Sequence, residues 1–323
     1  MNSFSPSVAV VGLGGFARTH LTLLSSLQAA DCCNIVAIAD PFANHDEDVV
    51  CAFEQSGTRL FSSLEKLLGE VQPEAVFIAT PIHLHEQQTV AALNAGCHVY
   101  VEKPPCATLA EWHRMKAAQD NANRRCEVGF LLQSSSSMQF LRRKLCEGVI
   151  GKVQQVWTGV RWSRNDNYYA RSSWAGHWQI DDTPVFDGPA TNALAHAVQT
   201  ALGLAASTPS SMPLVRQARG AIWRARPIES YDTAFLDIET TDDVAIRLVF
   251  THATSFSDEV VMRVKGEQGT AAITWNGQVT LHPEGKEEQQ FKFLQQPALS
   301  AFVSFLQSIA HTEHVTQTPL EHT

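Results

Sequence analysis

Two segments of this chain place chemically capable residues directly after apolar runs. The first is a glycine-rich turn, residues 12–17, which follows VAVV and leads into the helix-like segment ARTHLTLLSSLQ. The second is Glu102-Lys103-Pro104, which follows the apolar run HVYV. A glycine turn between a strand and a helix is typical of a site for a dinucleotide pyrophosphate. A lysine at a strand end beside such a cleft could exchange a proton with a substrate oxygen.

The small residues of the glycine turn have separate tasks. Gly12 allows the tight turn, Gly14 lets a pyrophosphate approach the backbone, and Ala17 stands where helix and strand pack closely. The helix that follows directs its first N–H groups and a partial positive charge at the phosphates. We therefore predict that five residues bind a cofactor here: Gly12, Gly14, Gly15, Phe16 and Ala17.

A second apolar run, NIVAIAD, ends in Asp40. An acid about 20 residues beyond the glycine turn holds a ribose 2′-OH in dinucleotide-binding folds. The alternative is that Asp40 is only a turn residue before Pro41. No Arg or Lys follows Asp40 closely, and its carboxylate would repel a 2′-phosphate. The sequence therefore predicts NAD as the cofactor rather than NADP.

The order of apolar runs predicts an α/β protein with two domains. Strand-like and helix-like segments alternate up to about residue 130, including a helix near Asp46 to Ser56, which favours a doubly wound parallel sheet. From about Gly151 the runs alternate like half-buried strands and favour a mostly antiparallel open sheet. We predict a Rossmann domain over residues 1–130 and an α/β domain for substrate binding and oligomerisation over residues 131–323.

Composition excludes several classes of function. The chain has 323 residues and a net charge of −9, which argues against nucleic acid or an anionic membrane as a partner. No stretch is apolar enough to span a bilayer, and the N-terminus has no signal-peptide pattern. Seven cysteines show neither disulfide nor metal-ligand spacing, so we predict a reducing cytoplasm and no metal.

In doubly wound sheets, ligands bind beyond the carboxyl ends of the strands. The predicted strand ends are the glycine turn, Thr80-Pro81 and Glu102-Lys103-Pro104. Residue spacing alone leaves Lys103 open to two interpretations, a proton-transfer residue or a surface lysine paired with Glu102.

Four segments resemble the Gfo/Idh/MocA family, which includes glucose–fructose oxidoreductase and inositol 2-dehydrogenase. They are VAVVGLGGFARTH, IATPIHLHEQQTVAALNAGCHVYVEKP, VGFLLQ and EGVIGKVQQV. The resemblance implies NAD(P)-dependent hydride transfer at a hydroxyl or carbonyl carbon of a sugar, cyclitol or related compound. It also implies an open sheet that forms subunit contacts, and hence a homodimer or homotetramer.

The resemblance also implies roles for individual residues. Lys103 matches the catalytic lysine of the family, with Glu102 and Pro104 shaping its turn, and His196 matches a substrate-binding histidine. Asn192 and Trp174 are expected on the substrate side. The residues expected on the cofactor side are Thr80, Pro81, His85, Glu102 and Gln133.

The chain departs from the family pattern at several positions. Asn192 and Gln199 stand where members often carry aspartates, and asparagine cannot take a proton. Asp187 is a candidate to compensate. Members also continue beyond the equivalent of residue 323, which predicts a truncated or shortened second domain. Two alternatives therefore stay open: an NAD-using enzyme that eliminates a group as some glycosidases do, and a non-catalytic sensor of NAD and a sugar.

Overall fold

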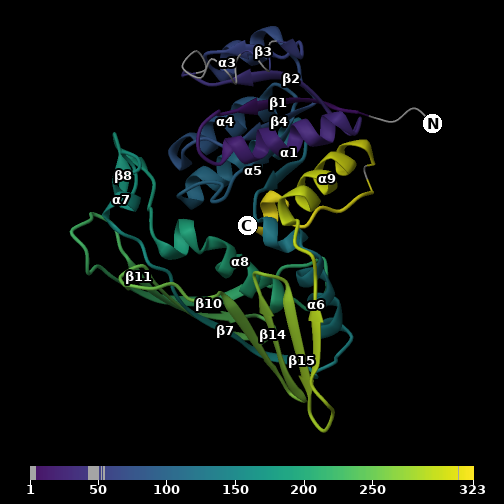
Figure 1. Cartoon of the computed structure of the whole chain (residues 1–323), viewed down its shortest axis with the longest axis vertical. Coiled ribbons are helices and arrows are strands. Elements are labelled where there is room, and N and C mark those ends of the chain that lie inside the picture. The colour runs from purple at the N-terminus through teal and green to yellow at the C-terminus, as the bar shows by residue number, and fades with distance from the viewer. Residues whose placement is uncertain (1–4, 43–50, 52, 54, 312) are drawn as a thin grey trace. The chain divides into compact units, whose positions relative to one another are not determined.

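The computed structural model describes residues 5–42, 51, 53, 55–311 and 313–323. Most of the predicted helix near Asp46 to Ser56 lies outside these residues. The chain divides into two compact units, which are described separately (Figure 1). Unit 1 holds residues 1–129, 301–321 and 323, and unit 2 holds residues 130–300 and 322.

Unit 1 is built on a six-stranded parallel sheet with the strand order β3-β2-β1-β4-β5-β6. Apolar, mostly β-branched residues fill the central strands, and every residue of β4 is buried. This pattern matches a parallel sheet covered on both faces. The strands are β1 Ser7–Val11, β2 Asn34–Ala39, β3 Arg59–Phe61, β4 Ala75–Ile78, β5 His98–Val101 and β6 Cys126–Val128.

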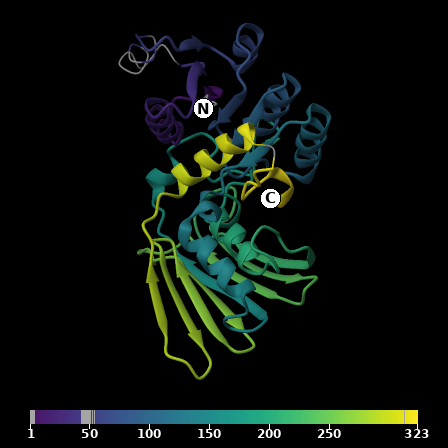
Figure 2. The ribbon, with the colours of Figure 1, turned by 90° about the vertical axis from the view of Figure 1, so that its right-hand side faces the viewer.

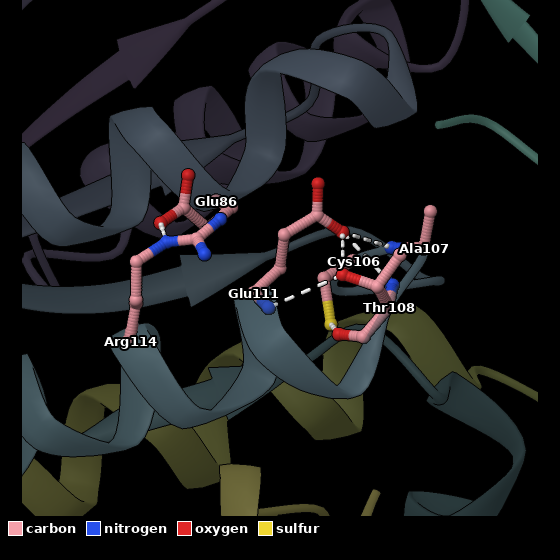
Figure 3. Close-up of polar contacts among 6 residues, drawn as sticks. All are labelled: Glu86, Cys106, Ala107, Thr108, Glu111 and Arg114. Carbon is pink, nitrogen blue, oxygen red and sulfur yellow. Dashed lines mark hydrogen bonds and ion pairs between the residues drawn. The ribbon is translucent and has the colours of Figure 1, made fainter. Parts of the chain in front are cut away.

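In the described part of unit 1, four helices connect these strands: α1 Ala17–Ala29, α3 Leu64–Glu70, α4 Ile82–Asn94 and α5 Leu109–Ala122. Helix α5 begins with a capping box: the Thr108 hydroxyl accepts from Glu111 N at 3.2 Å, and the Glu111 carboxylate accepts from Thr108 N at 2.8 Å (Figure 3). This capping box satisfies N–H groups that the first turn leaves without partners. Glu86 on α4 and Arg114 on α5 then form an ion pair at 2.7 Å.

Strand β6 has only three residues and ends at Val128. After Val128 the chain leaves the sheet at Gly129, where an added Cβ would lie 2.8 Å from Glu102 Oε1. A short 3₁₀ helix, η2, then covers Leu131–Ser134.

Residues 301–321 belong to unit 1, whereas the sequence placed them in the second domain. They include most of α9, Pro297–Ala310, which is yellow in Figure 1. Phe302 and Phe305 of this helix are fully buried against Phe77 and Tyr100, with ring centroids 4.9 to 5.5 Å apart. The aromatic contacts explain the difference, because these side chains complete the core of unit 1 rather than that of unit 2.

Unit 2 contains an eight-stranded sheet in the order β10-β11-β12-β7-β13-β14-β15-β16, in which only β7 and β12 pair in parallel. Its strands are β7 Val153–Arg161, β10 Val215–Trp223, β11 Thr233–Thr240, β12 Ala245–Thr251, β13 Val261–Gly266, β14 Gly269–Thr274, β15 Gln278–Pro283 and β16 Gln289–Lys292. The predicted α/β fold, a parallel sheet followed by a mostly antiparallel one, is confirmed.

Two helices cover one face of the unit 2 sheet (Figure 2). They are α6 Ser136–Cys146 and α8 Ala195–Leu204. Val156, Leu248 and Phe250 point toward them and are buried in one apolar core. Unit 2 also contains the smaller elements α7 Asp166–Tyr169, β8 Gln179–Ile180, β9 Thr183–Pro184 and the π-helical turn η3 Pro189–Ala193. A 3₁₀ turn, η4 Leu320–His322, lies near the end of the chain.

No helix in the described part of the chain is long and apolar enough to cross a membrane.

Candidate active site

Gly12 has a conformation and surroundings that admit no side chain. Its φ is +107°, its N–H donates to Ala39 O at 2.9 Å, and an added Cβ would lie 2.9 Å from Ala79 O. Any other residue would combine an unfavourable left-handed backbone with a steric clash. The tight turn predicted from the sequence therefore depends on glycine at this position.

Gly14 and Gly15 differ from Gly12, because a Cβ added at either would meet no heavy atom within 4 Å. Helix α1 begins directly after them, and Ala17 N donates to Gly14 O at 3.1 Å. Phe16 occupies the N-cap with no side-chain hydrogen bond to the helix. The turn thus combines open space over the backbone with a helix N-terminus, which fits the pyrophosphate of a dinucleotide.

Asp40 lies at the carboxyl end of β2 and connects that strand to the glycine turn. Its Oδ2 accepts from Leu13 N at 2.7 Å, and its Oδ1 accepts from Phe42 N at 2.7 Å. These bonds hold the carboxylate beside the turn where a ribose would follow the phosphates. The position of the Asp40 carboxylate beside the glycine turn therefore fits NAD. The contact between Asp40 and a ribose hydroxyl stays a prediction.

Thr80 and His85 connect the end of β4 to the turn after β5. The Thr80 hydroxyl donates to Gln88 Oε1 at 2.6 Å, and Pro81 is the N-cap of α4. The His85 ring lies 2.8 Å from Thr80 O and 2.7 Å from Pro104 O. Burial lowers the pKa of His85, and each of its ring nitrogens faces one of these carbonyl oxygens. These contacts give His85 a positioning role; its contact with the cofactor stays a prediction.

Sequence reasoning missed His20, a buried residue of α1 that contacts Glu102. His20 Nε2 lies 2.8 Å from Glu102 Oε1, and the other carboxylate oxygen accepts from Lys103 N at 3.2 Å. The imidazole has no exposed surface and lies edge-on to Phe77 and Phe302. The Glu102 carboxylate is therefore fixed by α1 and in turn fixes the backbone that carries Lys103. The pattern A-R-T-H after the glycine turn was the available signal, because it puts His20 on the first turn of the helix.

These contacts gather the predicted residues of unit 1 at one edge of its sheet. The glycine turn follows β1, Asp40 follows β2, Thr80 follows β4, and Glu102 with Lys103 follows β5. In parallel sheets this edge is where ligands bind.

His196 lies in the first turn of α8 in unit 2. Its ring is edge-on to Phe130 and Trp275, with centroids 5.9 and 6.1 Å away. Trp275 follows β14, 79 residues further along the chain by number, and no local pattern identified it.

Asn192 lies on the π-helical turn η3, just before α8. Its Nδ2 donates to Asp187 Oδ1 at 2.7 Å. Turns of this kind are frequent at functional sites. The structure thus pairs the two residues that the sequence singled out separately.

Trp174 and Gln133 contact other protein groups. Trp174 stacks on the Arg171 guanidinium, 4.8 Å from its ring centroid. Gln133 is buried in unit 2, where its Nε2 donates to Gln199 O at 2.8 Å and its Oε1 accepts from Arg142 at 3.4 Å. These bonds give Gln133 a structural role, and its predicted contact with the cofactor stays a prediction.

Among the residues that the structure describes, no group of three or more His, Cys, Asp or Glu side chains could hold a metal ion.

The fold and the strand-end residues define a class: a two-unit α/β protein whose first unit carries a dinucleotide-binding Rossmann fold. Residues 7–130 match the family model of the Gfo/Idh/MocA oxidoreductases, described as an oxidoreductase family with an NAD-binding Rossmann fold. The match covers most of unit 1 and less than half of the whole chain, and it supports an NAD-binding Rossmann fold in that unit.

The chain is also similar to curated proteins that are named dehydrogenases. Inositol 2-dehydrogenase 1 of Saccharopolyspora erythraea is 26% identical over 87% of this chain and 77% of its own length. The 4-carboxy-2-hydroxymuconate-6-semialdehyde dehydrogenase of a Sphingobium species is 27% identical over 53% of each protein. The chain thus spans about half the length of some of the curated relatives that it matches.

Solved structures extend the likeness to both units. The WlbA dehydrogenase from Bordetella pertussis, crystallised with NADH and UDP-GlcNAcA, superposes with a TM-score of 0.79. The alignment covers 99% of this chain and 92% of that protein at 23% identity, so it shows a shared fold.

Proposed function

We propose that this protein is an NAD-dependent oxidoreductase that acts on a hydroxyl or carbonyl carbon of a sugar, cyclitol or related compound. The observation that carries the proposal is the edge of the unit 1 sheet, where the glycine turn, Asp40 and the Glu102-Lys103 turn follow neighbouring parallel strands. The names of the relatives, which include inositol and sugar dehydrogenases, support the substrate class.

Lys103 is the proposed acid/base residue. In the direction of oxidation it would take the proton of the reacting hydroxyl, and in reduction it would return that proton to the oxygen. Glu102 fixes the backbone of Lys103 through the 3.2 Å hydrogen bond, and His20 holds Glu102. Bound NAD would supply the hydride acceptor or donor.

His196 and Asn192 are the proposed substrate-orienting residues of unit 2. The rings of Phe130 and Trp275 restrict the rotation of the His196 imidazole, and Asp187 restricts that of the Asn192 amide. An imidazole and an amide both hydrogen-bond to hydroxyl groups, which are the recurring groups of a polyol.

The substitution Lys103→Met tests the proposal most directly. Wild type and variant are mixed with NAD and a panel of aldoses, inositols and sugar acids at mildly alkaline pH, and NADH is followed by absorbance. We expect turnover in the wild type, a loss of at least a hundredfold in the variant, and the same NAD affinity in both. Equal turnover in the two proteins would exclude Lys103 as the acid/base residue.

The same assay separates the two alternatives. Product formation without accumulation of NADH would favour elimination through a transient oxidation. Binding of NAD and of a sugar without any turnover would favour a sensor.

The proposal includes a second copy of this chain as partner and a reducing compartment, the cytoplasm, as location. The face of the unit 2 sheet opposite α6 and α8 carries large apolar side chains, and Val249 there is 47% exposed. Phe235 and Val249 are register partners on β11 and β12 and so point to this same face. All seven cysteines are free thiols, which suits a reducing compartment.

A further inference from the structure

Asp187 is a buried carboxylate of unit 2 to which the proposed chemistry assigns no proton transfer and no contact with the substrate. Its side chain is 3% exposed, and burying a charge is costly unless polar partners compensate. Gly176 N donates to Oδ2 at 2.7 Å, Asn192 Nδ2 donates to Oδ1 at 2.7 Å, and Arg171 Nη2 lies 3.9 Å from Oδ2. Each carboxylate oxygen therefore faces its own hydrogen-bond donor.

This arrangement dictates which end of the Asn192 amide faces Asp187. A carboxylate only accepts hydrogen bonds, so the amide must turn its NH₂ group toward Asp187. The carbonyl oxygen Oδ1 is then on the side away from Asp187. The assignment of Nδ2 and Oδ1 in the Asn192 amide therefore follows from the hydrogen-bonding chemistry of the carboxylate.

The surroundings hold both residues in place. The hydroxyl of Tyr231 accepts from Thr191 N at 3.2 Å, and the Tyr231 ring packs on Gly188, where an added Cβ would lie 2.2 Å from it. Phe186, directly before Asp187, has φ +48°, a strained value for a bulky residue. Strain of this kind persists where the surrounding structure enforces it, and it clusters at functional sites.

Arg171 completes the setting of Asp187. Its guanidinium lies over the Tyr168 ring at 3.7 Å and over the Trp174 ring at 4.8 Å from the centroids. It also donates to Tyr168 O at 2.6 Å. The guanidinium is thereby held close to the carboxylate and stabilises its negative charge.

We propose that Asp187 is a positioning residue that makes Asn192 a hydrogen-bond acceptor for a hydroxyl of the substrate. The inference rests on the proposed function and specifies it: position 192 selects a neutral hydroxyl donor and takes no proton, because an amide oxygen accepts hydrogen bonds without being a base. The ligand class is a polyhydroxylated compound with a hydroxyl group directed at position 192.

The isosteric substitution Asp187→Asn is the decisive variant. The new side chain has only one acceptor oxygen for two donors. The backbone N–H of Gly176 cannot turn, so it retains that oxygen, and the new NH₂ group faces Asn192. The Asn192 amide must then flip and turn its oxygen toward residue 187, which takes the acceptor away from the substrate side.

Steady-state kinetics test the substrate part. We expect Asp187→Asn to raise the KM for the substrate about tenfold, as for the loss of one good hydrogen bond, with an unchanged Kd for NAD. Asn192→Ala should raise the KM by a similar factor. When both substitutions are combined, the KM should be no higher than in Asn192→Ala alone. Additive effects of the two substitutions, or an unchanged KM in Asp187→Asn, would overturn the proposal.

A substrate-free measurement separates this proposal from the proposed function. Protein labelled with ¹⁵N-asparagine gives a side-chain amide signal for Asn192, identified by its absence in Asn192→Ala. We expect this signal to shift in Asp187→Asn, and an unshifted signal would contradict the positioning role. If the Asn192 signal shifts but neither the wild type nor any variant shows turnover, the positioning role stands and the oxidoreductase proposal fails.

Asp232→Asn is the matched control for a merely structural effect. Asp232 is also a buried carboxylate that accepts from backbone N–H groups, those of Ala225 at 2.9 Å and Arg226 at 2.8 Å. We expect this substitution to lower the unfolding midpoint without changing the Asn192 signal or the KM. If Asp232→Asn changes both as Asp187→Asn does, the effect is general loosening of unit 2 and the proposal is wrong.

Discussion

Asp40 is the residue of unit 1 on which we expect the choice between NAD and NADP to depend. Asp40 accepts hydrogen bonds from Leu13 N and Phe42 N, so its carboxylate is held rigidly beside the turn. A fixed negative charge favours the ribose 2′-hydroxyl of NAD and repels the 2′-phosphate of NADP. We therefore expect a preference for NAD over NADP that depends mainly on the Asp40 carboxylate.

The substitution Asp40→Asn should weaken this preference. The amide keeps the size of the side chain and removes the charge, so we expect the Kd for NAD to rise about tenfold and the Kd for NADP to fall. Titration of both cofactors by calorimetry measures the two values. Asp120→Asn, an exposed carboxylate on α5, is the control that should change neither. An unaltered ratio of the two affinities in Asp40→Asn would contradict this account.

Secondary-structure elements of unit 1 are joined over long sequence distances by a few polar contacts. The segment after α9 lies along the edge of β6, where Val128 N donates to Thr318 O at 2.9 Å and Thr318 N donates to Glu127 Oε1 at 2.8 Å. Covering an edge strand in this way protects its unpaired backbone groups. Glu127 is buried at this junction, and burial raises its pKa from 4.5 to about 7.

The raised pKa makes the stability of this junction depend on pH. Between pH 4.5 and about 7 the folded state binds more protons than the unfolded state, so the free energy of unfolding falls as pH rises through this window. Glu127→Gln keeps the acceptor oxygen and cannot ionise. Relative to this variant, the wild type should lose up to about 3 kcal/mol between pH 4.5 and pH 8. Unfolding midpoints of both proteins at several pH values measure the difference, and parallel curves would show that Glu127 does not titrate in this range.

At the scale of the whole molecule, the face of the unit 2 sheet opposite α6 and α8 is the proposed contact surface for a second copy of the chain. On it the apolar side chains of Phe235 and Val249 lie beside the Arg247–Asp237 ion pair, which has an N–O distance of 3.2 Å. Exposed apolar side chains surrounded by charges are typical of subunit interfaces. A second copy of the chain, related by a two-fold axis, would cover this face with an identical one.

The substitution Val249→Glu tests this assembly, because it would bury two like charges in a two-fold interface. We expect the wild type to sediment as a dimer or tetramer and Val249→Glu to sediment at a lower mass. Val315→Glu is the matched control: Val315 is 60% exposed in unit 1, and its replacement should leave the mass unchanged. A monomeric wild type would exclude the proposed assembly.

Several features could be predicted because local chemistry determines them. The Thr108-x-x-Glu111 capping box involves four consecutive residues, and the positive φ of the turn at residue 12 favours glycine there. Other elements were missed for physical reasons. Strand β10 lies at a sheet edge with nearly all of its residues exposed, so its sequence lacks alternation, and β16 has only four mostly polar residues.

Through the family resemblance the sequence pointed to Lys103 as the candidate proton-transfer residue. By itself it determined the glycine turn, the parallel sheet of the first domain and the cofactor class. These follow from residue types within short windows, where backbone sterics and burial leave few alternatives. Only the tertiary structure decided that His20 holds Glu102 from 82 positions away, that Asp187 orients Asn192, and that residues 301–321 complete the core of unit 1. Each of these depends on contacts between groups that the chain brings together only when it folds, because hydrogen bonds and packing act over a few ångströms in space, whatever the separation along the sequence.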